Sequence, residues 1–289
     1  MLRVTDKQYW MDNYLKKELD TIVYNLPRDW DFVLGVSGDG MTRVGKSMLG
    51  QQIGYYVAHS LKTPFSVDNI VFSGDELIKL AHKLPKNSVI IYDEARAELS
   101  SKAAVKNLST NLLDFFAECG MLNHLVILIL PDFFELNKSL AVNRTSMLIN
   151  VFRTSENKKL SNGNNVIELK RGHFEVYGPR EKRKLYVVGK KQYDNYAVGK
   201  SLRNFYGQFM KYDIIDSEEY NTKKISFLKR EKTNIQNDTL LRIKEVALNM
   251  TKQPDTKGLG KERICQLCGI SRQTLYRYEK TVRLNHIDT

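Results

Sequence analysis

The sequence has few of the features that membrane-spanning and secreted proteins need. Its longest apolar run, residues 125–130, is far shorter than the ~20 apolar residues that a membrane-spanning helix requires. The first ten residues, MLRVTDKQYW, contain no apolar segment of the kind found in signal peptides. Both observations predict a protein of the cytoplasm of the cell that makes or hosts it, with no membrane insertion.

Cysteine is also scarce, with three in 289 residues. An odd number fits a reducing compartment, in which disulfides do not persist. Cys265 and Cys268 have the C-x-x-C spacing of zinc ligands, but no second pair lies near them and His286 is badly spaced. We therefore expect small helix-core residues here and no zinc.

At 289 residues the chain has room for about two domains, and its 42% of hydrophobic residues is enough for a sizeable core. The net charge of +12 is unevenly distributed. Residues 1–150 hold 16 Lys and Arg against 17 Asp and Glu, and the remainder holds 29 against 16. An excess confined to one half favours a polyanionic partner, with nucleic acid first, an anionic membrane surface second, and solvated basic loops as the alternative.

Residues 40–47 read GMTRVGKS and match the phosphate-binding loop (P-loop) pattern G-x-x-x-x-G-K-[ST]. An apolar run, FVLGV, precedes the loop, and a segment with helical spacing follows it. In such a loop Lys46 places its charge between the β- and γ-phosphates, and Ser47 offers a hydroxyl to Mg²⁺. The residues expected to bind the nucleotide are Gly40, Arg43, Val44, Gly45, Lys46, Ser47 and Met48.

The segment SVIIYDEA, residues 88–95, predicts a buried strand that brings two carboxylates to the sheet edge where the P-loop lies. Asp93 is expected to hold the Mg²⁺ shell, and Glu94 to polarise the water that attacks the γ-phosphate. A glutamate here favours a RecA-like core, in which a further strand separates the P-loop strand from the Asp93 strand. The sequence has no N-K-x-D motif, which argues against a small GTPase.

Two more parallel strands are expected, at residues 124–130 and 147–152. Asp132 follows the first of them and is predicted either to sense the γ-phosphate or to cap the next helix. Arg144 precedes the second, where it either reaches the γ-phosphate of a neighbouring subunit or pairs with a surface carboxylate. Arg153 and Arg43, the latter inside the P-loop, are further candidates for the role in a neighbouring site.

Together, GMTRVGKS, SVIIYDEA, HLVILILPDFF and AVNRTSMLINVF resemble the core of the FtsK/HerA family of DNA-pumping ATPases, over roughly residues 28–155. That family belongs to the additional-strand, catalytic-glutamate class. The resemblance implies an α/β, RecA-like fold with a mostly parallel sheet, a ring that is usually hexameric, ATP and Mg²⁺ as cofactors, and duplex DNA as the moved substrate. Packaging ATPases and zonular-occludens-toxin-like proteins have a similar layout.

The expected catalytic residues are thus Glu94, Lys46 and Arg144, and the expected metal ligands are Ser47 and Asp93. The family likewise has an acid pair, a sensor at the end of its fourth strand and an arginine ahead of its fifth. One departure is the Pro-Asp pair at 131–132, since the family often has a neutral polar residue at its sensor.

Residues 154–165 are polar and rich in turn residues, and the Asn-Gly pair at 162–163 predicts a hairpin. We therefore place the end of the ATPase domain at residue 155. Residues 166–196 are predicted to form short strands with interleaved Lys, Arg and Tyr. That composition suits contact with phosphates, but it is also ordinary for strands. The ELK triplet at 168–170 has no upstream acid placed to make it a nuclease site.

Residues 156–232 are expected to form a basic accessory region and a linker. Residues 216–232 are predicted to form a charged helix that ends at a polar break, residues 233–238. A helical DNA-binding domain is expected over residues 233–289.

Residues 260–280, GKERICQLCGISRQTLYRYEK, have the spacing of a helix-turn-helix. Ile264 and Leu267 are expected to face inward, Ser271 to cap the second helix, and Leu275 and Tyr278 to pack against the first. The segment resembles the DNA-binding ends of resolvase-like recombinases and small repressors, although such motifs also mediate protein contacts. The residues expected to face the DNA major groove or its phosphates are Arg272, Gln273, Thr274, Tyr276 and Arg277.

These features predict an ATP-hydrolysing, DNA-directed motor, a ring-forming translocase or packaging ATPase of a mobile element or virus. The alternative is an ATP-switched adaptor or regulator, acting in transposition or replication initiation, that assembles on DNA without moving it. Glu94 favours the motor, and the helix-turn-helix favours the adaptor. A plain repressor with a degenerate loop is disfavoured because the P-loop pattern and Asp93 are complete.

Overall fold

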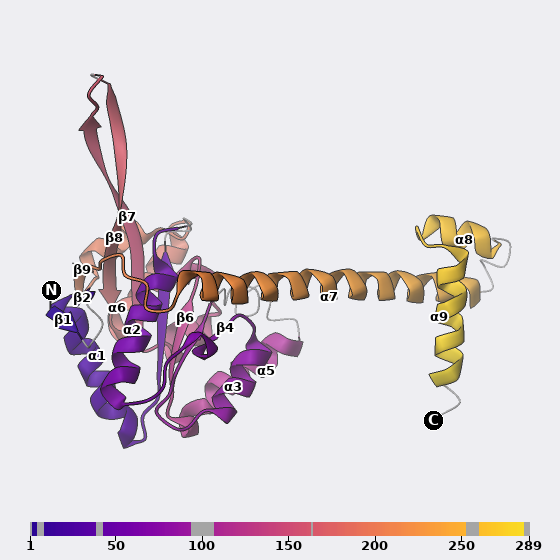
Figure 1. The fold of residues 1–289 in the computed structure, drawn as a ribbon, viewed down its shortest axis with the longest axis horizontal. Helices are drawn as coiled ribbons and strands as arrows, with labels where there is room; N and C mark the ends of the chain where they lie inside the picture. The colour runs from indigo at the N-terminus through magenta and orange to yellow at the C-terminus, as the bar shows by residue number, and fades with distance from the viewer. Residues whose placement is uncertain are drawn as a thin grey trace. The chain divides into compact units, whose positions relative to one another are not determined.

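The structure is a computed structural model that describes residues 2–4, 9–38, 43–93, 107–162, 164–252 and 260–285 (Figure 1). The chain divides into two compact units, Met1–Tyr220 and Asn221–Thr289. Among the described residues, no helix is long and apolar enough to cross a membrane.

The first unit is built on a mixed β-sheet whose strand order, over the described residues, is β4-β5-β6-β3-β7-β8-β9. The first five strands in this order run parallel, and β8 and β9 are antiparallel additions. The predicted fold class, an α/β domain with a mostly parallel sheet, is confirmed. The strands are β3 (Phe32–Gly38), β4 (Ile70–Val71), β5 (Val89–Tyr92), β6 (Leu125–Ile129), β7 (Met147–Lys159), β8 (Asn165–Tyr177) and β9 (Phe205–Gln208), with β1 (Leu2–Val4) and β2 (Tyr9–Met11) forming a separate antiparallel pair.

Helices cover the central strands, which are buried along their length and therefore read as continuous apolar runs. α1 contacts α2, which lies against β5 and β6, whereas α3 and α5 pack against each other. Gly50 lets α2 approach the sheet, because a Cβ there would lie 2.9 Å from Cδ1 of Ile129. Among the described residues before Ser217, the α-helices are α1 (Asn13–Asn25), α2 (Lys46–Leu61), α3 (Gly74–Lys83), α5 (Asn107–Glu118) and α6 (Pro179–Lys191).

The strands predicted within residues 179–191 are wrong, because this segment forms α6. Pro179 stands in the first turn, where its missing N–H costs nothing. Leu185, Tyr186 and Gly189 are buried at helical spacing, so one face packs on the domain. The Tyr and Val residues that suggest a strand are outweighed by this burial pattern.

Lys182 is a buried lysine of α6. Its Nζ donates hydrogen bonds to the carbonyl oxygens of Ala141, at 2.9 Å, and Val142, at 2.8 Å. These carbonyls belong to a π-helical turn, Leu140–Arg144. Desolvation lowers the pKa of Lys182 to about 8, because burial penalises the charged ammonium.

The shifted pKa of Lys182 predicts a pH-dependent stability. The folded chain releases this proton near pH 8, and the unfolded chain near the ordinary value of 10.5. Between these two pH values the unfolded chain binds more protons than the folded chain. The contribution of Lys182 to the free energy of unfolding therefore rises with pH. Relative to Lys182→Met, the wild type should gain on the order of 2 kcal/mol over this range in urea denaturation. A difference between the two proteins that is independent of pH would contradict the assignment.

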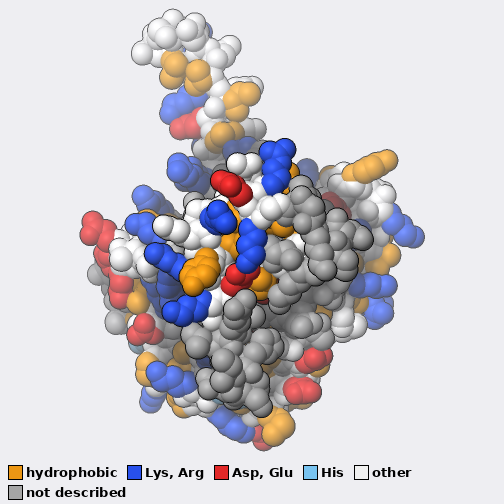
Figure 2. Space-filling model, turned by 90° about the vertical axis from the view of Figure 1, so that its right-hand side faces the viewer, with side chains coloured by type: hydrophobic (Ala, Val, Ile, Leu, Met, Phe, Trp, Pro, Cys, Tyr) orange, Lys and Arg blue, Asp and Glu red, His pale blue; other side chains and the backbone are white. Residues whose placement is uncertain are grey.

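The predicted hairpin is present, because β7 and β8 pair antiparallel up to Lys159 and Asn165. They extend from the first unit as a two-stranded arm (Figure 1). Figure 2 shows hydrophobic side chains along the arm. The exposed hydrophobic residues of the arm include Leu160, Val166, Ile167 and Leu169. The boundary placed at residue 155 falls inside β7, and the compact unit continues to Tyr220. The polar, turn-rich residues there are the end of an arm within one sheet.

The second unit contains most of α7 (Ser217–Lys252) together with α8 (Lys261–Leu267) and α9 (Arg272–Asn285). The predicted break at residues 233–238 is wrong, since α7 runs through it. Residues 217–252 contain neither proline nor glycine, and polar residues alone do not end a helix. The core residues of this unit are Ala247, Leu248, Ile264, Cys265 and Leu275.

Candidate functional site

The described residues of the P-loop, 43–47, lead into α2 at the carboxyl edge of the parallel strands. α2 begins at Lys46, directly after Gly45, whose φ of +106° favours glycine. A Cβ on Gly38, the last residue of β3, would lie 3.2 Å from the Nζ of Lys46, so the ammonium lies against the end of that strand. Val44 is buried and Arg43 is exposed. Met48 is half-buried in α2, and Gly40 lies outside the described residues.

Ser47 and Asp93 meet at this edge. The Oγ of Ser47 donates a hydrogen bond to Oδ2 of Asp93 at 3.1 Å, and Asp93 is only 2% exposed. Asp93 follows β5, and its backbone N–H donates to the carbonyl of Val71. The predicted extra strand is present, because β6 pairs with both β3 and β5. Glu94 lies outside the described residues.

The hydroxyl of Ser47 and the carboxylate of Asp93 fit a magnesium–nucleotide site. Hydroxyl and carboxylate oxygens are the ligands that Mg²⁺ prefers. Lys46 supplies a positive charge, and the N-terminus of the 16-residue α2 adds the positive end of its dipole. The arrangement can therefore bind a triphosphate and its metal.

Asp132 follows β6 and caps the short helix Phe133–Glu135. Its Oδ1 accepts hydrogen bonds from the backbone N–H of Phe134 and the hydroxyl of Tyr196, both at 3.0 Å. Desolvation raises the pKa of this carboxyl. The Tyr196 hydroxyl also lies 3.3 Å from Oγ of Ser37 in β3. The capping role is confirmed, and the sensing role stays a prediction.

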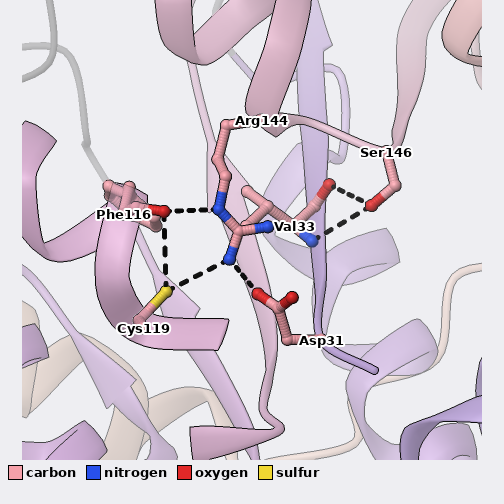
Figure 3. A network of polar contacts seen from close by, with 6 residues as sticks. All are labelled: Asp31, Val33, Phe116, Cys119, Arg144 and Ser146. Atoms are coloured by element: carbon pink, nitrogen blue, oxygen red, sulfur yellow. Dashed lines mark hydrogen bonds and ion pairs between the residues drawn. The ribbon is translucent and has the colours of Figure 1, made fainter. Parts of the chain in front are cut away.

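Arg144 lies in a network of polar contacts (Figure 3). It precedes β7, at the amino ends of the parallel strands, whereas the P-loop follows the carboxyl end of β3. Its guanidinium forms an ion pair with Asp31, donates to the carbonyl of Phe116, and lies 3.2 Å from Sγ of Cys119. Burial lowers the pKa of Arg144 and raises that of the Cys119 thiol to about 11. The chain thus shows a pairing with a carboxylate, and contact with a neighbouring γ-phosphate stays a prediction.

The Arg144–Asp31 pair predicts a loss of stability when either partner is removed. Both side chains are about a fifth exposed, so Arg144→Ala should lower the free energy of unfolding by about 2 kcal/mol, less than for a fully buried pair. Asp31→Asn should cost a similar amount, and the double variant little more than either. Urea denaturation measures all three. Fully additive losses would show that the two residues do not act as a pair.

The role of Arg144 in a neighbouring site has a separate test. Mixing Arg144→Ala subunits with Lys46→Ala subunits should restore part of the ATP turnover if Arg144 acts on the next subunit. No rescue would count against that role and leave only the structural one.

Two further residues, which belong to no sequence motif, lie at the carboxyl edge of the parallel strands. Phe209 packs on the P-loop, since a Cβ on Gly45 would lie 2.9 Å from its Cζ. Tyr220 donates a hydrogen bond to Asp93. No local pattern in the sequence marks either residue, because each acts through a contact that is distant along the chain.

The second unit has the helix-turn-helix geometry that the sequence predicts. Gly269, with φ of +65°, forms the turn between α8 and α9. Ser271 caps α9 by accepting a hydrogen bond from the N–H of Thr274 at 3.1 Å. Leu275 is buried as expected, whereas Leu267 is 60% exposed, so its expected inward position is wrong.

Four of the five predicted DNA-contacting residues, Arg272, Gln273, Tyr276 and Arg277, are exposed on α9. Thr274 is half-buried, and its Oγ1 lies 2.8 Å from Oγ of Ser271. A hollow of about 550 Å³ lies beside this surface. Its lining residues are Lys261, Arg272, Gln273, Leu275, Tyr276, Arg277 and Glu279.

No protein-family model matches this chain, and no curated protein matches it. The solved structures similar to it include two of the genome-packaging NTPase B204 from Sulfolobus turreted icosahedral virus 2, one with ATP-gammaS and one with sulfate. Each is 16% identical and covers 53% of this chain and 94% of the viral chain, with TM-scores of 0.35 and 0.34.

Proposed function

We propose that this chain is an ATP-hydrolysing, DNA-directed motor, a ring-forming translocase or packaging ATPase. The observation that carries the proposal is the contact between Ser47 and Asp93 beside the P-loop lysine, with β6 between β3, which precedes the loop, and β5, which precedes Asp93. This contact joins two residues that are 46 apart in the sequence and that the proposal assigns to one metal site.

In this proposal each group has one task. Lys46 and the N-terminus of α2 bind the phosphates, and Ser47 and Asp93 hold Mg²⁺, which neutralises charge on the phosphate oxygens. Glu94, the residue after Asp93, accepts a proton from the attacking water and orients it. Arg144 of a neighbouring subunit is the candidate for the charge that completes the site in a hexameric ring.

DNA is the proposed partner because positive charge and exposed side chains coincide in the second half of the chain. Arg272 and Arg277 lie on the exposed side of α9, which follows the turn as a recognition helix does. Arginine and glutamine read base edges, whereas tyrosine and threonine commonly hold phosphates.

The second candidate is an adaptor whose binding to DNA is switched by ATP without movement along it. The complete helix-turn-helix favours this alternative, because site-specific DNA recognition is what an adaptor needs and a translocating ring does not require.

Displacement of a triplex-forming strand from duplex DNA separates the two candidates. A motor removes the strand in the presence of Mg·ATP, and the Lys46→Ala variant should leave it in place. ATP turnover that rises with duplex DNA but displaces no strand would contradict the motor and favour the adaptor.

The exposed arginines of α9 have a separate test. The double variant Arg272→Ala with Arg277→Ala should lose preference for a DNA site while keeping ATP turnover. An unchanged preference would argue that α9 contacts protein instead.

A further inference from the structure

The segment that follows β9 contacts the P-loop, α2 and Asp93. We call residues 209–220 the strap. It starts at Phe209, which is buried, packs on Gly45 of the P-loop, and donates its backbone N–H to the carbonyl of Gly172 at 2.8 Å. The strap therefore begins in contact with the loop that would hold phosphate.

A buried amide of α2 holds the middle of the strap. Gln52 is 1% exposed, and its Nε2 donates to the carbonyls of Met210, at 3.0 Å, and Tyr212, at 3.1 Å. Ile214 and Ile215 are buried after it. The path of the strap is thus fixed by hydrogen bonds to the helix that starts at the P-loop.

The strap ends in the first turn of α7, against the metal-site carboxylate. Asp216 caps this helix by accepting hydrogen bonds from the N–H groups of Glu218 and Glu219. Tyr220, in the same turn, donates a hydrogen bond from its hydroxyl to Oδ2 of Asp93. The same oxygen also accepts the hydrogen bond from Ser47. The Tyr220 ring packs on Phe72, with centroids 6.1 Å apart.

We infer that Tyr220 is a positioning residue for Asp93, which couples Mg²⁺ binding to the first turn of α7. This inference rests on the proposed function. The terminal torsion of an aspartate is soft, and two hydroxyl donors on one oxygen restrict it. Hydrogen bonds to a carboxylate are among the stronger ones, and loss of a partner that orients a metal ligand typically weakens metal binding 10–100-fold.

The coupling runs in both directions. If the Tyr220 hydroxyl favours the metal-bound site, the bound site must favour the turn that carries Tyr220 by the same factor. The backbone amides of residues 217–224 should then exchange hydrogen more slowly when Mg²⁺ and nucleotide are bound.

Binding of a fluorescent ATP analogue to the full chain, titrated with Mg²⁺, tests the inference. Tyr220→Phe keeps the ring on Phe72 and removes only the hydroxyl. It should need about 10-fold more Mg²⁺ for half-maximal binding, with metal-free binding unchanged. It should also lose the slowing of hydrogen exchange. Tyr193→Phe is the matched control, because Tyr193 is fully exposed.

An unchanged Mg²⁺ requirement in Tyr220→Phe would overturn the inference. So would an equal loss of binding with and without metal, since that result would mean that Tyr220 only supports the fold. Failure of the proposed function is distinguishable from both outcomes, because the wild type itself would then show no Mg²⁺-dependent binding.

Discussion

Lys46→Ala should reduce ATP turnover by at least about 100-fold, the usual cost of losing one preorganised charge or donor at a reacting group. The ammonium of Lys46 lies against the end of β3, beside the N-terminus of α2, where the β- and γ-phosphates are expected. Alanine removes this charge while favouring the helix that it begins. Phosphate release at saturating Mg·ATP measures the effect.

The matched control for this prediction is Lys79→Ala, which removes a lysine from the exposed face of α3. It should retain full turnover. If Lys46→Ala hydrolyses ATP at the wild-type rate, GMTRVGKS is an ordinary glycine-containing turn and the nucleotide site is wrong.

Glu94→Gln should bind Mg·ATP normally and hydrolyse it about 10²–10⁴-fold more slowly. Glutamine keeps the shape of the side chain and its ability to orient water, but it does not accept the proton. ATP should therefore remain trapped on the protein. Single-turnover hydrolysis gives the rate, and retention of labelled ATP on a filter gives the binding.

Glu118→Gln, at the exposed end of α5, is the control for charge removal and should behave as the wild type. Normal hydrolysis by Glu94→Gln would assign water activation to another residue. Loss of ATP binding in this variant would place Glu94 in binding and not in the chemical step.

The parallel part of the sheet was predictable because its strands are short apolar runs at the positions that a P-loop domain requires. Burial on both faces makes such runs easy to recognise. The helix at residues 179–191 could not be predicted in this way. Its Tyr and Val residues favour strands, whereas the burial of Leu185 and Tyr186, which follows a helical period, is visible only in the structure. The continuity of α7 was missed for a similar reason, since its polar residues resemble a linker although none of them breaks a helix.

The candidate site was predictable where the chemistry is local. Lys46 and Ser47 belong to one loop, and Asp93 ends a recognisable strand. The contact of Tyr220 with Asp93 joins residues 127 apart, and that of Arg144 with Asp31 joins residues 113 apart. No spacing rule connects such pairs, because the fold alone brings them together.

The rate of phosphate release by the full chain, with Mg·ATP and increasing long duplex DNA, tests the central claim most directly. The account predicts turnover that requires Mg²⁺, disappears in Lys46→Ala, and rises severalfold as DNA is added. A chain that releases no phosphate, or releases it at a rate indifferent to DNA, would contradict a DNA-directed ATPase.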